Sequence, residues 1–310
     1  MAMYWKNVPI VILFILFAFS AQATDIDKTI IVDGLKRQYL VHLPPGYTAA
    51  KQLPVIFALH GGGGEYKGTP KQYNLNAPAD KFNFIIVYPN ALNKSWSMKG
   101  VSSRVRGGGS EDIDDVHFIS VLMDTLVRYY KADDKRFFCT GISRGGIFSL
   151  YLAQHLSNRI KAIAPVCASI PLSISDNYSF GHPMPVLMIN GTADPLILYN
   201  GGEGRFTPDN NGVQFNMLPT EQLVKKIVGL NGCNAQATVY NIPDADPSDG
   251  CTAAKYSYTG PNADVIFIKI TGGGHTWAGG PQYLPKFIIG KVCRDFKAED
   301  EIFSFFISLK

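Results

Sequence analysis

The stretch Gly141-Ile142-Ser143-Arg144-Gly145 decides the fold that we expect for this chain. A strand-like apolar run at 136–140 precedes it, and a run with helical spacing at 144–157 follows it. A Gly-x-Ser-x-Gly sequence between a strand and a helix is typical of a nucleophile elbow, which lifts a serine hydroxyl above the edge of a sheet. Glycines flank such a serine because side chains would collide in the sharp turn. We therefore predict that Ser143 is a nucleophile and that the Arg144 amide, at a helix N-terminus, faces developing negative charge.

Strand-like and helix-like runs alternate along most of the chain, after two opening strands. Such alternation predicts an α/β fold with a mostly parallel central sheet, helices on both faces and an antiparallel edge. The connections at 90–112, 168–183 and 196–217 are long, and long loops usually carry function or cover a site. The expected strands are 29–33, 36–43, 54–59, 83–88, 136–140, 162–167, 185–190 and 265–271, and the expected helices are 115–130, 144–157, 218–229 and 299–309.

A nucleophilic serine needs a base, and the base needs an orienting acid. After an elbow of this kind the chain order is serine, acid, histidine. His275 lies in a glycine-rich loop directly after a strand-like run, whereas His182 precedes a strand. Asp194 follows an apolar strand; taken alone it is equally typical of a turn before proline. Because all three residues follow strands in the required order, we predict Ser143 as nucleophile, Asp194 as acid and His275 as base.

A glycine loop follows the buried strand at 54–58 and reads His60-Gly61-Gly62-Gly63-Gly64. Acyl transfer requires backbone amides aimed at the developing oxyanion, and glycines let a backbone approach the substrate closely. We expect one donor from the Arg144 amide and the other from Gly61 or Gly62. A phosphate-binding loop is the rival interpretation, but Thr69 occupies the position where that motif requires lysine.

These motifs together resemble the polyhydroxybutyrate depolymerase and feruloyl esterase group of secreted α/β-hydrolases, or carbohydrate esterase family one. The resemblance implies an α/β-hydrolase fold and the same Ser143, Asp194 and His275 triad. Two positions depart from the group: Gly62 stands where many relatives carry cysteine, and Arg144 where they often carry alanine. The matching stretches are 58–64, 84–89, 114–119, 141–146, 162–166, 190–195, 231–233 and 273–277.

The N-terminal residues 1–23 are typical of a secretory signal peptide. A positive residue, an apolar core and the cleavage-site sequence Ala21-Gln22-Ala23 follow one another. We therefore expect a secreted protein, extracellular or periplasmic, in which 24–310 form a single catalytic α/β-hydrolase domain. The apolar run is short for a membrane span, so we expect no membrane association after removal of the signal. A net charge of +4 is small for a chain of this length and does not indicate a surface that binds nucleic acid.

Five cysteines in a secreted chain allow two disulfides. Cys233 and Cys251 lie in a polar, turn-rich stretch, and we predict that they form a disulfide. The pairing of Cys139, Cys167 and Cys293 stays open. Histidine and cysteine spacing predicts no metal site; an acidic cluster at Asp112, Asp114 and Asp115 is more typical of helix capping.

Aromatic residues in the long loops are candidates for substrate binding. Trp96, Trp277 and Tyr199 could stack on an aromatic or sugar ring, although Trp96 could equally be packed under its loop and Trp277 could support His275. The sequence thus predicts a monomeric serine esterase without a cofactor, and the resemblance implies that it acts on an ester derived from plant cell wall or from a polyester. The alternatives are an acyltransferase on the same fold and a non-catalytic polymer-binding protein.

Overall fold

A computed structural model describes residues 22–101, 113–204 and 216–309. Most of the predicted signal peptide lies outside these residues, as does Asp112. Within the described ranges, no helix is both long and apolar enough to cross a membrane.

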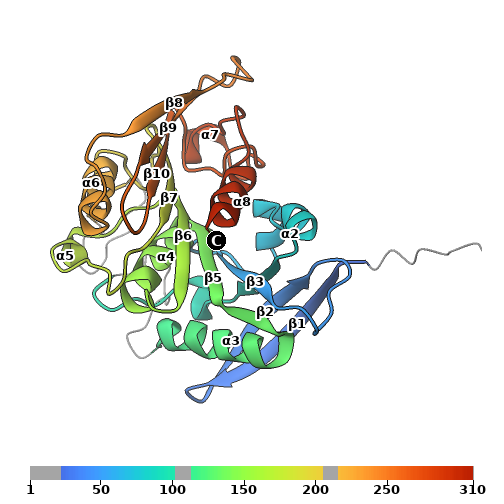
Figure 1. The fold of residues 1–310 in the computed structure, drawn as a ribbon. Coiled ribbons are helices and arrows are strands. Elements are labelled where there is room, and N and C mark those ends of the chain that lie inside the picture. The colour runs from blue at the N-terminus through green and yellow to red at the C-terminus, as the bar shows by residue number, and fades with distance from the viewer. Residues whose placement is uncertain (1–21, 102–112, 205–215, 310) are drawn as a thin grey trace, which may run out of the picture.

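A ten-stranded sheet runs through the described part of the chain in the order β1-β2-β4-β3-β5-β6-β7-β10-β9-β8. The six strands from β4 to β10 in this order pair in parallel, and antiparallel strands flank them on both sides. The predicted mostly parallel sheet is therefore confirmed (Figure 1). The strands are β1 (Thr24–Val32), β2 (Leu35–Leu43), β3 (Leu53–Leu59), β4 (Ile85–Pro89), β5 (Ala132–Ile142), β6 (Ile160–Val166), β7 (Val186–Gly191), β8 (Thr238–Ile242), β9 (Thr252–Tyr258) and β10 (Val265–Thr271).

Helices cover both faces of the sheet, as predicted. The helices α3, α4 and α6 lie on one face and α2 and α8 on the other (Figure 1). Each face has its own buried apolar cluster, because the central strands are apolar on both sides. The helices are α1 (Thr69–Tyr73), α2 (Asn76–Phe82), α3 (Asp115–Tyr130), α4 (Arg144–His155), α5 (Leu172–Ser175), α6 (Thr220–Leu230), α7 (Lys286–Ile289) and α8 (Ala298–Ser308), with a 3-10 turn at Leu92–Lys94.

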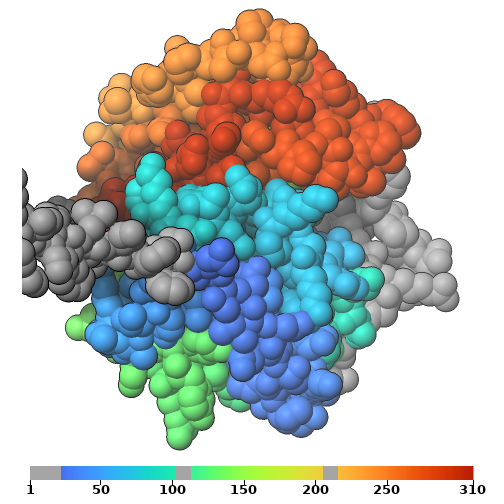
Figure 2. Space-filling model, turned by 90° about the vertical axis from the view of Figure 1, so that its right-hand side faces the viewer, coloured from blue at the N-terminus to red at the C-terminus, as the bar shows by residue number. Residues whose placement is uncertain are grey.

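Sequence-distant segments meet on the α2–α8 face. In Figure 2 the light blue and cyan segment that contains α1 and α2 lies against the red C-terminal segment. The first turn of α8 is acidic, with Glu299, Asp300 and Glu301 near the positive end of the helix dipole. Glu299 is nevertheless buried, because it binds side chains from other elements.

The antiparallel edge formed by β8 and β9 was not predicted. All five residues of β8 are exposed or half-exposed, so the strand lacks the buried alternation that reveals an amphipathic strand. It is held by backbone pairing to β9 instead. Because β3, β5, β6, β7 and β10 are parallel, their carboxyl ends meet at a single edge of the sheet.

Candidate active site

Ser143 occupies a strained turn between β5 and α4. Its backbone angles, φ 57° and ψ −125°, lie in a region that residues with side chains rarely adopt. A Cβ atom at Gly141 would lie 2.4 Å from the Leu59 carbonyl oxygen, and one at Gly145 would lie 2.0 Å from the same atom. The two glycines are therefore required by the close approach of β3. This geometry is that of a nucleophile elbow.

Asp194 and His275 form a buried pair at the same edge of the sheet. The Asp194 Oδ2 atom lies 2.7 Å from His275 Nδ1, although 81 residues separate the two in the chain. The other carboxylate oxygen accepts hydrogen bonds from the amides of Leu196 at 2.8 Å and Ile197 at 2.9 Å. The predicted acid–base contact thus exists. The contact between Ser143 Oγ and His275 Nε2 stays a prediction.

The loop that carries His275 is fastened on two sides. The His275 amide donates to the Ile289 carbonyl at 2.6 Å, and the Gly274 amide donates to Lys291. A Cβ at Gly191 would lie 2.2 Å from the Gly273 carbonyl oxygen, so the loop packs directly on the end of β7. The position of the histidine backbone is therefore fixed by the contacts of its own loop.

Cys167, at the end of β6, lies between the elbow and the acid–base pair. Its thiol donates to the carbonyl of Thr276 at 3.3 Å, and its sulfur lies within 4.8 Å of ligand atoms of Asp194 and His275. Burial raises the pKa of this thiol well above its usual value, so it remains a neutral donor. The residue before Cys167, Val166, accepts a hydrogen bond at its carbonyl from the amide of Ser143. The end of β6 therefore contacts both halves of the site.

The glycine loop lies beside the elbow. A Cβ at Gly61 would lie 3.7 Å from the Ser143 Cβ, so the loop and the serine share one edge of the sheet. His60 is structural: its Nε2 accepts from the Ala91 amide at 3.0 Å, so Nδ1 carries the proton and donates to the Gly61 carbonyl at 2.8 Å. Burial lowers the pKa of His60, which favours this neutral form.

The side chain of Arg144 is directed toward the backbone of Trp96. It is buried, and its Nε and Nη2 atoms donate to the Trp96 carbonyl at 3.0 and 2.6 Å. The Trp96 indole in turn donates to the His60 carbonyl at 2.9 Å. The residue after the predicted nucleophile thus holds the loop that supports the glycine turn.

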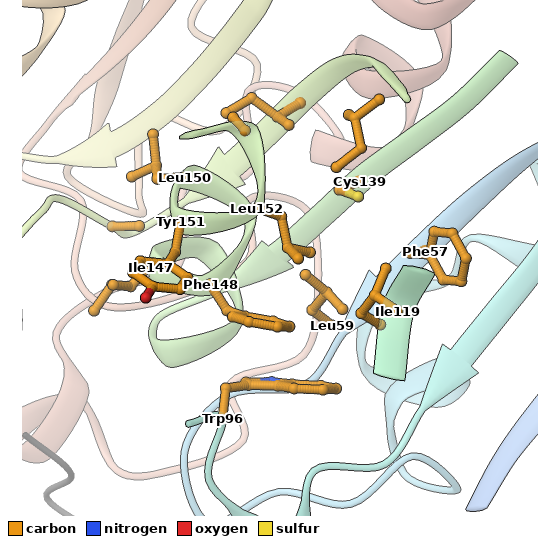
Figure 3. Packing of buried hydrophobic residues seen from close by; sticks show 14 of the residues in the cluster. Phe57, Leu59, Trp96, Ile119, Cys139, Ile147, Phe148, Leu150, Tyr151 and Leu152 are labelled. Atoms are coloured by element: carbon orange, nitrogen blue, oxygen red, sulfur yellow. The ribbon is translucent and has the colours of Figure 1, made fainter. Parts of the chain in front are cut away.

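The three aromatic residues predicted to bind substrate are buried. Trp96 stacks on Phe148 with ring centroids 4.7 Å apart (Figure 3). Trp277 stacks on Tyr73 at 4.4 Å, and Tyr199 donates its hydroxyl to Glu221 at 2.8 Å. Their polar atoms bind protein groups and their rings fill the core. The prediction that they line a binding surface is therefore wrong, and for Trp96 and Trp277 the packing alternatives hold.

A family model described as "Putative esterase" matches residues 34–193, which is more than half of the chain. The chain belongs to this esterase family. It is 26% identical over 299 residues to "Putative esterase NocK" of Nocardia uniformis subsp. tsuyamanensis, covering 93% of this chain and 84% of that protein. It is 28% identical to feruloyl esterase C of Emericella nidulans, covering 76% of each. An S-formylglutathione hydrolase of Agrobacterium tumefaciens has a similar fold, with a TM-score of 0.55 at 12% identity, over 93% of this chain and 96% of that one.

The protein is thus a carboxylic ester hydrolase with the α/β-hydrolase fold. The resemblance to feruloyl esterases is confirmed, whereas the likeness to polyhydroxybutyrate depolymerases stays a prediction.

The predicted disulfide between Cys233 and Cys251 is absent, and both thiols of this esterase are free. Cys233 Sγ donates to the Ala263 carbonyl at 3.1 Å, beyond the end of β9, whereas Cys251 precedes the start of that strand. A seven-residue strand spans roughly 23 Å, far more than a disulfide can bridge. Proximity in sequence was misleading because β9 separates the two residues.

Two groups of side chains in the described residues offer donors spaced for a metal ion. One is Cys167, Asp194 and His275, and the other is Asp249, Cys293 and Asp295. In both, an aspartate already accepts hydrogen bonds from two backbone amides: Asp194 from Leu196 and Ile197, and Asp249 from Cys251 and Arg294.

The acidic cluster singled out in the sequence consists of Asp112, Asp114 and Asp115, of which the structure describes the last two. Asp114 caps the N-terminus of α3, and Asp115 pairs with Arg37 in the core.

Sequence reasoning missed the segment that follows the His275 loop. Tyr283 donates its hydroxyl to the His275 carbonyl at 3.1 Å, and Leu284 and Phe287 on the same segment are 43% and 77% exposed. The only sequence signal was an aromatic, apolar run outside any long helix or strand. These residues place exposed apolar surface on the segment that contacts His275, the predicted base.

Proposed function

We propose that this esterase is a secreted serine carboxylic-ester hydrolase acting through an acyl-enzyme on polymer-derived or phenolic esters. One observation carries the proposal: a buried 2.7 Å Asp194–His275 pair lies at the sheet edge that bears the strained Ser143. Strain at a serine and a buried acid–base pair serve no need of the fold, and such features cluster at active sites.

In the proposed mechanism, Ser143 Oγ attacks the ester carbonyl carbon while His275 Nε2 takes the hydroxyl proton. Asp194 fixes the tautomer, because its carboxylate accepts the Nδ1 proton and stabilises the resulting imidazolium. The tetrahedral oxyanion receives hydrogen bonds from the amide of Arg144 and from the glycine loop. The alcohol leaves with the proton from His275, and a water molecule deprotonated by His275 then releases the acid.

The glycine loop supplies its oxyanion donor, in this proposal, through Gly62. Gly62 is exposed, whereas Gly61 is only partly exposed. Gly62 is therefore the better placed of the two predicted donors.

The proposed substrates are feruloyl, acetyl xylan or hydroxybutyrate esters. A relative over three quarters of the chain is a feruloyl esterase. The exposed Leu284 and Phe287, on the segment that holds His275, suit an aromatic or apolar acyl group rather than a charged one. We propose this segment as the acyl-binding side in place of the buried tryptophans.

Two measurements test the function. A fluorophosphonate should label wild-type protein at Ser143 and leave Ser143→Ala unlabelled. Hydrolysis of methyl ferulate, acetylated xylan, short p-nitrophenyl esters and hydroxybutyrate oligomers should then rank the acyl groups. Ser143→Ala should lose on the order of a millionfold in kcat, as serine triads do. A folded Ser143→Ala protein with a tenth of the wild-type rate would remove Ser143 as nucleophile.

A further inference from the structure

The hydroxyl of Tyr73 lies at the junction between the glycine loop and the nucleophile elbow. It donates to the Leu59 carbonyl at 2.9 Å and accepts from the Ile142 amide at 3.3 Å. Leu59 leads into the glycine loop, and Ile142 directly precedes Ser143. One buried hydroxyl therefore contacts both halves of the proposed acyl-transfer site.

The Leu59 carbonyl is a sensitive place for such a contact. It lies directly beneath the elbow, where both Gly141 and Gly145 must lack a Cβ to make room for it. A shift of this oxygen by a few tenths of an ångström would press on the turn that holds Ser143. The hydrogen bond from Tyr73 thus fixes an atom on which the strained geometry of the elbow depends.

The ring of Tyr73 is itself held rigidly. It is fully buried and stacks on the Trp277 indole, with an interplanar angle of 2°. Buried Glu299 on α8 accepts from the Trp277 indole at 3.0 Å and from the side chain of Asn74, next to Tyr73, at 3.2 Å. Trp277 is two residues from His275. The same arrangement therefore connects Tyr73 to the loop of the proposed base.

We propose that Tyr73 is a positioning residue that sets the spacing between the oxyanion donors and the nucleophile. The inference rests on the proposed serine mechanism. Tyr73 acts through Leu59 and Ile142 and does not touch the substrate. Because oxyanion donors stabilise the transition state more than the ground state, a change in their spacing should lower kcat and leave KM nearly unchanged.

The test is Tyr73→Phe, which removes the hydroxyl and retains the ring stack. The matched control is Tyr178→Phe, since Tyr178 is also buried and donates to a backbone carbonyl, that of Leu150, at 3.0 Å. We expect roughly a 10- to 100-fold lower kcat for Tyr73→Phe on a soluble p-nitrophenyl ester, with KM within twofold. The affinity for a boronic acid, which forms a tetrahedral adduct, should fall by the same factor. Tyr178→Phe should show a comparable loss in Tm with wild-type kcat.

A Tyr73→Phe protein with kcat within twofold of wild type, or an equal loss in Tyr178→Phe, overturns the inference. Should Tyr73→Phe not fold, 3-fluorotyrosine at position 73 retains the hydroxyl. Its fluorine resonance should shift when a fluorophosphonate modifies Ser143, whereas the same label at position 178 should not respond; an unshifted signal at 73 counts against the proposal. Failure of the wild type to react with fluorophosphonate would instead remove the proposed serine mechanism itself.

Discussion

Replacing Asp194 by asparagine should abolish most of the activity without unfolding the protein. One carboxylate oxygen accepts the amides of Leu196 and Ile197, and the other accepts from His275 Nδ1. An asparagine must keep its oxygen toward the two amides, because turning its NH₂ group there would leave two buried donors unsatisfied. Each unsatisfied donor costs roughly 1–3 kcal/mol. The NH₂ group therefore faces His275 and selects the tautomer with the proton on Nε2.

In that tautomer His275 cannot accept the serine proton. The same change in a serine protease lowers kcat by about 10⁴, equivalent to about 5.4 kcal/mol in the barrier. Since the two amides fix the orientation here, we expect a loss of this size for Asp194→Asn. The assay is kcat on a p-nitrophenyl ester, with Tm measured in parallel.

The matched control for this change is Asp249→Asn. Asp249 is also buried and also accepts two amides, those of Cys251 and Arg294, each at 2.6 Å. It should lose stability and keep kcat within a few-fold of wild type. A folded Asp194→Asn protein with more than one hundredth of the wild-type kcat would refute the assignment of Asp194 as the acid.

Three further outcomes are expected. Cys167→Ala should lower kcat roughly fivefold, because it removes one hydrogen bond worth about 1 kcal/mol, that from the thiol to the Thr276 carbonyl. Cys167→Ser should recover part of the loss, and an alanine variant with the wild-type kcat would contradict this role of the thiol. His60 has a pKa below its ordinary value near 6.5, so the unfolded chain binds a proton at this residue before the folded protein does as the pH falls. The contribution of His60 to the free energy of unfolding is therefore complete above about pH 6.5 and falls as the pH drops toward the folded-state pKa. The difference in Tm between wild type and His60→Gln across about pH 5–8 should show this trend, and a difference that does not change with pH would refute it. Denatured protein should titrate five thiols with an aromatic disulfide reagent, and dithiothreitol should leave Tm unchanged; one or three thiols would instead indicate disulfides.

The sequence predicted the parts of the site that depend on the order of strands. Ser143, Asp194 and His275 each follow a buried strand, and parallel strands deliver their ends to one edge, so the chain order sufficed to bring Asp194 and His275 together. The glycines around Ser143 were equally readable, because only a close backbone approach explains them. The parallel sheet could be predicted because its strands are continuous apolar runs, as expected for strands that are buried on both faces.

The parts that depend on tertiary contacts could not be predicted. Tyr73 belongs to a five-residue helix, and its partner Ile142 lies 69 residues away, a distance that no periodicity encodes. Trp277 is conspicuous in the sequence as an aromatic residue close to the predicted base. In the structure its side chain points inward, because its ring stacks on Tyr73 and its indole nitrogen donates a hydrogen bond to Glu299. Burial, which decides whether an aromatic residue packs or binds, is a property of the assembled molecule.

The position of Glu299 in the chain has a consequence for biosynthesis. The ribosome makes Ser143, Asp194 and His275 before it makes α8, so a nascent chain can contain the whole predicted triad and still lack the acceptor that holds Trp277 against Tyr73. The stack of Trp277 on Tyr73 should therefore reach its final geometry only after the last helix has left the exit tunnel.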